Sequence, residues 1–281
     1  MRGSMLLASL VLIPGGLPCQ ETEEVAADTV ASITKELAAE RSKWVAAYRK
    51  IKDKQERSAK AKTYPRPDAY RKRAWKLVRG VETTANAGDA LIWIVQNGAV
   101  GDESSRALGL LQKHHLEHEK LGAACVRLMF DIRPVVLKFL RDVKAGTSNR
   151  DTQGVALYAT AKVLMRRVGA ARRLSDADEK LMASYTGTYG EDTVQELLSL
   201  DEARVEAKAH ELLKQVQKEY ADAKLRGVPL GKKAAGDLFE IEHLAIGKNV
   251  PDIDGEDIDG VAFKLSDYEG KVVVLDFWGN W

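Results

Sequence analysis

The chain closes with Lys271-Val-Val-Val-Leu-Asp-Phe-Trp-Gly-Asn-Trp281, and this stretch decides how its last part is expected to fold. A basic residue leads into an unbroken apolar run, which is followed by an acid and then by aromatic and small residues. Strands that are covered on both faces lose the polar alternation of half-exposed strands. The run from Val272 to Phe277 is therefore predicted to be a buried strand of a parallel or mixed sheet.

The residues just before this run also favour turns and strands. The segment Asn249-Val-Pro-Asp-Ile-Asp-Gly-Glu-Asp-Ile-Asp-Gly260 is rich in turn formers, and Pro251 argues against a helix there. Val261 to Leu265 alternates as an edge strand does, and residues 266–270 are expected to form a turn or a single helical turn. Within the sequence given, we expect at most a hairpin between Val261–Leu265 and the closing run.

Upstream of Ile246 the pattern is helical almost throughout, from about Val25 to Glu242. One stripe of a long amphipathic helix, closed by Tyr64-Pro-Arg-Pro67, contains Val30, Ile33, Leu37, Trp44, Tyr48 and Ile51. Further helices are expected over residues 87–96, 102–111, 134–144, 152–171, 201–221 and 232–243, and around Cys125. A fixed repeat length is absent, and so is the Trp-Gly-Tyr spacing of tetratricopeptide repeats. The chain is therefore predicted to be mainly α, with an irregular helical array or bundle over residues 25–245.

Local signals predict where several of these helices begin and end. Asp68 and the segment Ser175–Asp178 are expected to cap helices at their N-termini. Pro134 fits a first helical position, and Asn97-Gly98 fits a helix end. A break at His114-His115 would separate His114 from His118, so a metal site at these histidines is not expected.

Composition sets few limits on function. The 281 residues are 45% hydrophobic and 30% charged, with a net charge of +2. This balance gives no net-charge argument for a nucleic-acid partner. The basic run from Lys50 to Lys62 contains Asp53 and Glu56, and we interpret it as the solvated face of a helix.

The N-terminus has the pattern of an export signal. Arg2 precedes the apolar run Met5–Ile13, which is too short to span a bilayer. Residues 1–24 are therefore expected to be a signal peptide, with Cys19 as an alternative lipid anchor, and the protein to be exported to the bacterial periplasm or cell envelope. The other cysteine, Cys125, lies on an apolar helix face, where a buried thiol is a poor nucleophile.

The segment Ile246–Trp281 resembles the opening of the AhpC/TSA–redoxin branch of thioredoxin-fold proteins. The resemblance rests on Pro251-Asp-Ile-Asp-Gly255, on Phe263-Lys-Leu-Ser-Asp-Tyr268 and on Gly270-Lys-Val-Val-Val-Leu-Asp-Phe-Trp278. It is strongest to the exported TlpA-like and ResA-like thiol-disulfide oxidoreductases. It implies that residues 246–281 are the first part of a thioredoxin-like α/β domain, and that a Cys-x-x-Cys pair belongs directly after Trp281.

The same resemblance implies roles for three residues. Asp276 matches a buried acid that assists proton transfer beneath the cysteine pair. Trp281 matches the aromatic residue that flanks the first cysteine, and Trp278 matches one that supports the active-site loop. Because the 281 residues stop before the cysteine pair, the chain as given is expected to be inactive, whereas the complete protein is expected to be an enzyme.

The resemblance implies an exported thiol-disulfide oxidoreductase, or antioxidant redoxin, with protein dithiols, protein disulfides or small thiols as partners. It implies no cofactor and no metal, and membrane contact only through the signal or a lipid anchor. Two alternatives stay open. One is a peroxiredoxin-type peroxide reductase, although Phe277-Trp-Gly-Asn-Trp281 lacks the Pro and Thr of that class. The other is a non-enzymatic helical binding or scaffold protein.

Overall fold

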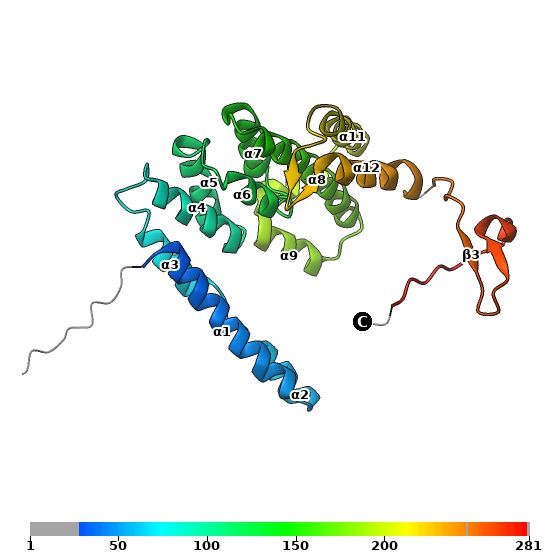
Figure 1. Ribbon diagram of the computed structural model, residues 1–281, viewed down its shortest axis with the longest axis horizontal. Coiled ribbons are helices and arrows are strands. Elements are labelled where there is room, and N and C mark those ends of the chain that lie inside the picture. Colours follow the sequence, from blue (N-terminus) through cyan, green and yellow to red (C-terminus); the bar gives the residue numbers. More distant parts are fainter. Residues whose placement is uncertain (1–27, 246, 280–281) are drawn as a thin grey trace, which may run out of the picture.

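The computed structural model describes residues 28–245 and 247–279. The predicted signal peptide, Cys19 and Trp281 lie outside the described residues. Within them the chain is mainly α, as predicted, with twelve α-helices and two small antiparallel sheets of two strands each (Figure 1).

From residue 28 onward, eleven helices precede the first strand. They are α1 (Val30–Lys50), α2 (Lys54–Ala61), α3 (Asp68–Lys76), α4 (Ala85–Asn97), α5 (Asp102–His114), α6 (Leu121–Leu128), α7 (Pro134–Gly146), α8 (Arg150–Ser175), α9 (Glu179–Tyr189), α10 (Glu191–Leu198) and α11 (Glu202–Glu219). The later elements are β1 (Lys224–Leu225), β2 (Val228–Pro229), α12 (Leu230–Phe239), the π-helical turn η1 (Glu240–Leu244), β3 (Asp254–Glu256), β4 (Ala262–Lys264) and the 3-10 turn η2 (Leu265–Tyr268).

The long helix α8 lies at the centre of the array and packs against α6, α7, α10, α11 and α12. Its sequence supports this place, because apolar and small residues occur on every side of the helix, as is typical of a buried one. At Gly154 the helix approaches its neighbours closely. A Cβ atom there would lie 2.9 Å from Cβ of Tyr220 and 3.0 Å from Cδ1 of Leu230. Glycine at this position therefore lets α8 pack tightly against α11 and the start of α12.

The core is divided unequally. The main cluster draws buried side chains from helices between α1 and α12, and the largest fully buried ones include Phe139, Ile94 and Leu213. A smaller cluster forms where α10 covers the C-terminal part of α8, and it consists of Ile132, Ala170, Leu174, Val194 and Leu197.

The predicted helix ends are partly confirmed. Pro134 is the first residue of α7, α4 ends at Asn97-Gly98, and the expected break at His114-His115 is present, although α5 continues past the predicted end at Leu111 to His114. Two predicted caps are wrong. Asp68 is the first residue of α3 and Pro67 precedes it, without a side-chain cap. Ser175 is the last residue of α8, and Asp178 alone caps α9 by accepting a hydrogen bond from the N–H of Leu181.

The first predicted helix is interrupted. Helix α1 ends at Lys50, and Asp53 caps a separate helix α2 by accepting a hydrogen bond from the N–H of Glu56 at 2.7 Å. An aspartate competes for backbone N–H groups in this way, which favours a helix start over a helix interior. Figure 1 shows the second half of α1 and all of α2 extending away from the rest of the array.

Helix α10 and the strands β1 and β2 were not predicted from the sequence. Helices α9 and α10 meet at Gly190, whose φ of 87° needs a residue without a Cβ atom. Strands β1 and β2 form a tight hairpin around Arg226-Gly227, and both turn residues have positive φ, 53° and 79°. This is the geometry of a type I′ turn, for which Asn-Gly or Asp-Gly is the usual signal. Because Arg226 stands where Asn or Asp is usual, the sequence did not reveal this turn.

The last part of the chain differs from its prediction. Strand β4 pairs with β3, in the register Asp254↔Lys264 and Gly255↔Phe263, and not with the closing run. The segment 249–260, expected to form turns alone, therefore contains a strand. Residues 272–279 form no regular structure and are mostly exposed, so the predicted buried strand Val272–Phe277 is not observed. A strand needs hydrogen-bonding partners, and the described residues offer it none.

Candidate functional site

Asp252 organises the C-terminal hairpin. Its carboxylate accepts hydrogen bonds from the backbone N–H of Ser266 at 2.9 Å, from the Ser266 hydroxyl at 2.8 Å and from the N–H of Ile253 at 3.1 Å. The backbone hydrogen bond from Ser266, followed by its hydroxyl, lowers the pKa of Asp252 below its ordinary value. Two of the residues on which the family resemblance rests thus hold each other in place across fourteen positions of sequence.

The turn between β3 and β4 closes in the same way. The Asp257 carboxylate accepts hydrogen bonds from the N–H groups of Asp259 and Val261, both at 2.9 Å. Gly260 supplies the positive φ of 79° that this turn requires. After β4, the Asp267 carboxylate accepts from the N–H of Lys264 at 2.8 Å. The repeated aspartates of this segment therefore act as local hydrogen-bond acceptors, which the sequence pattern alone did not indicate.

The closing run lies beside this hairpin without pairing to it. Val272 and Val274 are 97% and 88% exposed, whereas Val273 and Leu275 are 41% and 49% exposed. The alternation arises because Val273 and Leu275 line a cleft of about 610 Å³ whose other wall includes Pro251, Leu265 and Tyr268. The run is thus extended, and its alternate side chains, those of Val273 and Leu275, face the hairpin.

The structure does not bring the predicted site residues together. Asp276 is exposed, Trp278 is 84% exposed, and Trp281 lies outside the described residues. The buried setting that proton transfer by Asp276 would need is therefore not present in the described chain. No described side chain forms a hydrogen bond or an ion pair with Asp276 among the interactions of residues 28–245 and 247–279.

Cys125 is buried in α6, as predicted. Burial raises the pKa of its thiol to about 12, so the thiolate is scarce at neutral pH. The position suits a small apolar side chain and excludes a nucleophile.

The histidines between α5 and α6 pack inside the array. His115 is buried, and its Nε2 lies 2.6 Å from the carbonyl oxygen of Glu82, to which it donates. Burial, the largest influence, lowers the pKa of His115. His118 lies with Nε2 3.6 Å from a carboxylate oxygen of Asp89. Across the part of the chain that the structure describes, no group of three or more His, Cys, Asp or Glu side chains could hold a metal ion.

One polar cluster was missed at the sequence level. The Tyr158 hydroxyl donates to Asp237 at 2.6 Å, and the Lys162 ammonium donates to the other carboxylate oxygen at 2.7 Å. Burial, followed by the bond to Asp237, raises the pKa of Tyr158. Tyr158 and Lys162 are one helical turn apart on α8, which could have suggested a shared partner. Because the groups satisfy one another, the cluster ties α8 to α12.

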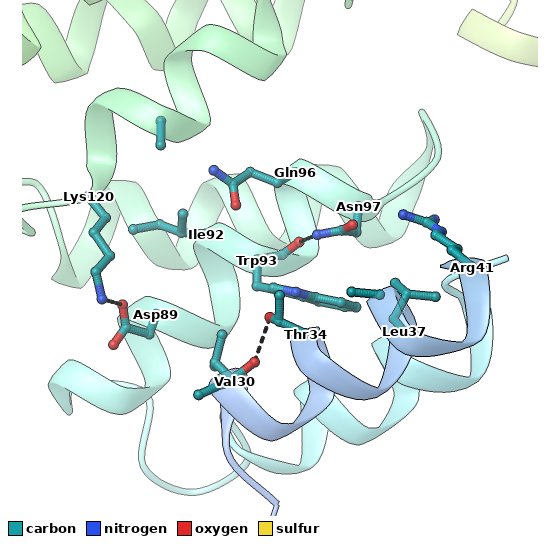
Figure 2. A pocket seen from close by; sticks show the side chains of 13 residues that line it. Val30, Thr34, Leu37, Arg41, Asp89, Ile92, Trp93, Gln96, Asn97 and Lys120 are labelled. Atoms are coloured by element: carbon teal, nitrogen blue, oxygen red, sulfur yellow. Dashed lines mark hydrogen bonds and ion pairs between the residues drawn. The ribbon is translucent and has the colours of Figure 1, made fainter. Parts of the chain in front are cut away.

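A groove of about 500 Å³ lies between α1, α4 and the start of α6 (Figure 2). Trp93 lies along it, with Leu37 and Arg41 of α1 on one side and Gln96 of α4 on the other. At the far end, the Lys120 ammonium donates to Asp89 at 2.9 Å. The lining of the groove is thus mixed, with an apolar stretch around Trp93 and Leu37 and an ion pair at one end. None of the described helices has both the length and the apolar character needed to cross a bilayer.

Comparison with known proteins gives a short similarity. A stretch of 38 residues is 45% identical to the protein named thiol-disulfide oxidoreductase ResA of Geobacillus thermodenitrificans (strain NG80-2), which covers 14% of this chain and 22% of that protein. The chain thus spans about a fifth of the length of this curated relative. No family model matches the chain, and no solved structure matches it. The findings connect a short part of the chain, and not its whole length, to a thiol-disulfide oxidoreductase.

Proposed function

We propose that the chain is the first part of an exported thiol-disulfide oxidoreductase, with a helical array followed by the opening of a thioredoxin-like domain. The observation that carries the proposal is the 45% identity to a thiol-disulfide oxidoreductase over 38 residues. That length is close to the span of residues 246–281, where the ordered redoxin-like motif occurs. The substrates are proposed to be protein dithiols, protein disulfides or small thiols.

In this proposal the cysteine pair follows Trp281, at the start of a helix. A thiol there is stabilised as thiolate by the helix dipole and the free N–H groups. Once the domain is complete, the run Val272–Phe277 becomes a covered strand and buries Asp276 beneath the pair. Asp276 then assists proton transfer to the second cysteine, Trp278 supports the loop, and Trp281 borders the first cysteine.

Disulfide exchange is preferred over peroxide reduction on the residues at hand. A peroxidatic cysteine is preceded by Pro and Thr in the peroxiredoxin pattern, and residues 277–281 contain neither. The self-contained hairpin supports the proposal in a different way. It holds the residues of the motif in place through Asp252 and Ser266 without help from the helical array.

The first test is to read the codons after Trp281 and to assay the extended protein. We expect a Cys-x-x-Cys, and catalysis of insulin reduction by dithiothreitol that is lost when the first cysteine is replaced by serine. Asp276→Asn should slow turnover by at least about tenfold and shift its pH profile, since general acid–base assistance typically contributes about 10²–10⁴ in rate. The 281-residue chain should show no turnover above its own Cys125→Ala variant.

Two results would contradict the proposal. The first is a continuation without a cysteine pair. The second is turnover by the 281-residue chain that disappears in Cys125→Ala. An extended protein that consumes peroxide faster than it reduces insulin would move the assignment to the peroxiredoxin class.

A second candidate is a binding or scaffold protein whose function resides in the helical array. The groove between α1, α4 and α6 favours it, because Gln96 is exposed beside the largely buried Trp93. This candidate predicts that deletion of residues 246–281 leaves function intact, whereas the oxidoreductase proposal predicts complete loss.

A further inference from the structure

Residues 41–66, the second half of α1 with α2 and the segment that follows it, form a strongly basic projection, which we call the basic arm. It contains ten Lys or Arg and two Asp or Glu. The remaining chain contains 33 Lys or Arg and 39 Asp or Glu, so acids elsewhere in the chain offset the charge of the arm in the near-neutral total. The solvated helix face expected from the sequence is thus part of a projection that continues from α1.

The arm is held in shape by its own aromatic residues. Trp44 stacks on Tyr48 with ring centroids 4.8 Å apart and meets Tyr64 edge-on at 5.0 Å. The Trp44 Nε1–H donates to the Thr63 hydroxyl at 3.1 Å, and Arg57 lies 5.0 Å from the Tyr48 ring centroid. These contacts fasten α2 and the following segment along α1, so the arm presents its charges from a fixed scaffold.

Arg41 and Arg57 lie over the rings of Tyr64 and Tyr48, but the positive charges of the arm meet no acidic partner in the described residues. No residue of the arm is buried, and none belongs to the hydrophobic core. Within the described residues, no Lys or Arg of the arm forms an ion pair, whereas Arg71 and Arg73 of the neighbouring α3 pair with acids. A compact set of unpaired like charges weakens the folded state by repulsion, so an external anion is the natural complement.

The shape of the arm selects the kind of anion. The arm is a projecting tip, and its aromatic rings stack on one another instead of offering open faces, as base stacking on single strands requires. A protruding tip with exposed lysines along both of its helices fits a broad, flat, negatively charged surface. We propose that the basic arm docks the protein on the anionic phospholipid headgroups of a bilayer, with each nearby Lys or Arg adding to the attraction.

The test compares two variants of equal net charge in the full chain. The arm variant carries Lys→Gln at Lys43, Lys50, Lys52, Lys54 and Lys62, which are all exposed. The control variant carries Lys→Gln at five exposed lysines of the body, Lys113, Lys180, Lys214, Lys218 and Lys232. All chains share residues 1–27, so any binding through that region is common to them.

Binding is measured by co-sedimentation with phosphatidylcholine vesicles that contain about one third phosphatidylglycerol, and with vesicles of phosphatidylcholine alone. In about 0.1 M salt, where the Debye length is about 10 Å, wild type and control should bind the anionic vesicles. The arm variant should bind at least about tenfold more weakly. Binding should be lost in about 1 M salt, where that length is about 3 Å. A Lys→Arg version of the arm variant should bind as wild type does, because it restores charge alone.

The proposal is overturned if the arm variant and the control bind anionic vesicles equally, or if phosphatidylcholine alone binds the wild type as well. It is also overturned if the wild type ignores both kinds of vesicle and binds a duplex or single-stranded oligonucleotide instead, because the partner is then a nucleic acid. Helical circular dichroism of every variant confirms that the chains compared are folded.

Discussion

Burial of Cys125 determines both its reactivity and its effect on stability. The thiol lies on α6 with a pKa raised to about 12 by the loss of solvation. At the residue scale, the sequence was sufficient here, because the apolar neighbours of Cys125 at helical spacing already predicted a buried position. The sequence was also sufficient to place Pro134 at the start of a helix. It was insufficient to identify the cap residues near Asp68 and Ser175, because several polar residues near a helix start can serve as the cap and only the backbone geometry selects one.

We therefore expect Cys125 to resist modification in the folded protein. In a Cys19→Ser background at pH 8, 5,5′-dithiobis(2-nitrobenzoate) should leave it unmodified, and denaturation in guanidinium should expose one thiol. Rapid modification of the native protein would mean that α6 opens locally.

The same burial predicts a pH dependence. A pKa that is raised on folding means that the folded state holds the proton more tightly than the unfolded state. The resulting stability is therefore present below pH about 9 and is lost as the pH rises toward about 12. In urea unfolding, the stability advantage of wild type over Cys125→Ala should shrink across this range. A constant difference would show that the thiol ionises equally in both states.

At the scale of elements, close packing of two helices depends on a glycine at the crossing point, where a side chain would not fit. Gly154 allows α8 to approach Tyr220 and Leu230, and Gly109 on α5 faces open space. Amphipathic periodicity predicted most of the helices but could not indicate which glycines lie at crossings, because this depends on the neighbouring helices. It also could not indicate the turn at Arg226-Gly227, whose positive φ values are imposed by the pairing of β1 with β2.

These two glycines form a matched pair for experiment. Gly154→Ala should lower the free energy of unfolding by about 1–3 kcal/mol, because the added methyl group overpacks the α8–α11 contact. Gly109→Ala should raise it by roughly 0.5–1 kcal/mol, because alanine is the better helix former where nothing obstructs it. Urea denaturation measures both. Equal effects of the same sign would mean that the crossing at Gly154 is looser than the distances indicate.

At the scale of the whole molecule, the array and the C-terminal segment differ in how much of their apolar surface the described residues cover. The array buries its own core, and the main cluster involves no residue beyond Ile241. The run Val272–Phe277 instead has the apolar sequence expected of a covered strand, but only Val273 and Leu275 are partly covered, by the neighbouring hairpin. The sequence correctly predicted that this run is extended. Whether it pairs with another strand depends on the rest of a sheet, which the sequence of one strand does not reveal.

An uncovered apolar run should promote association. Deletion of residues 246–281 is expected to leave the array folded and to raise the monomer fraction and the solubility. The double variant Val272→Lys and Val274→Lys, placed at the two most exposed valines, should reproduce the gain while keeping the hairpin. Sedimentation velocity at matched concentrations decides the matter. An unchanged monomer fraction in both chains would mean that another surface drives association.

The hairpin of β3 and β4 has a consequence for the order of events during synthesis. Its side-chain hydrogen bonds span at most fourteen residues, from Asp252 to Ser266, so each partner leaves the ribosome soon after the other. Local contacts of this kind form early, because little loop entropy must be lost. The hairpin of the newly made chain, held in register by the hydrogen bonds of its aspartates, can thus form before the residues that follow it are available for pairing.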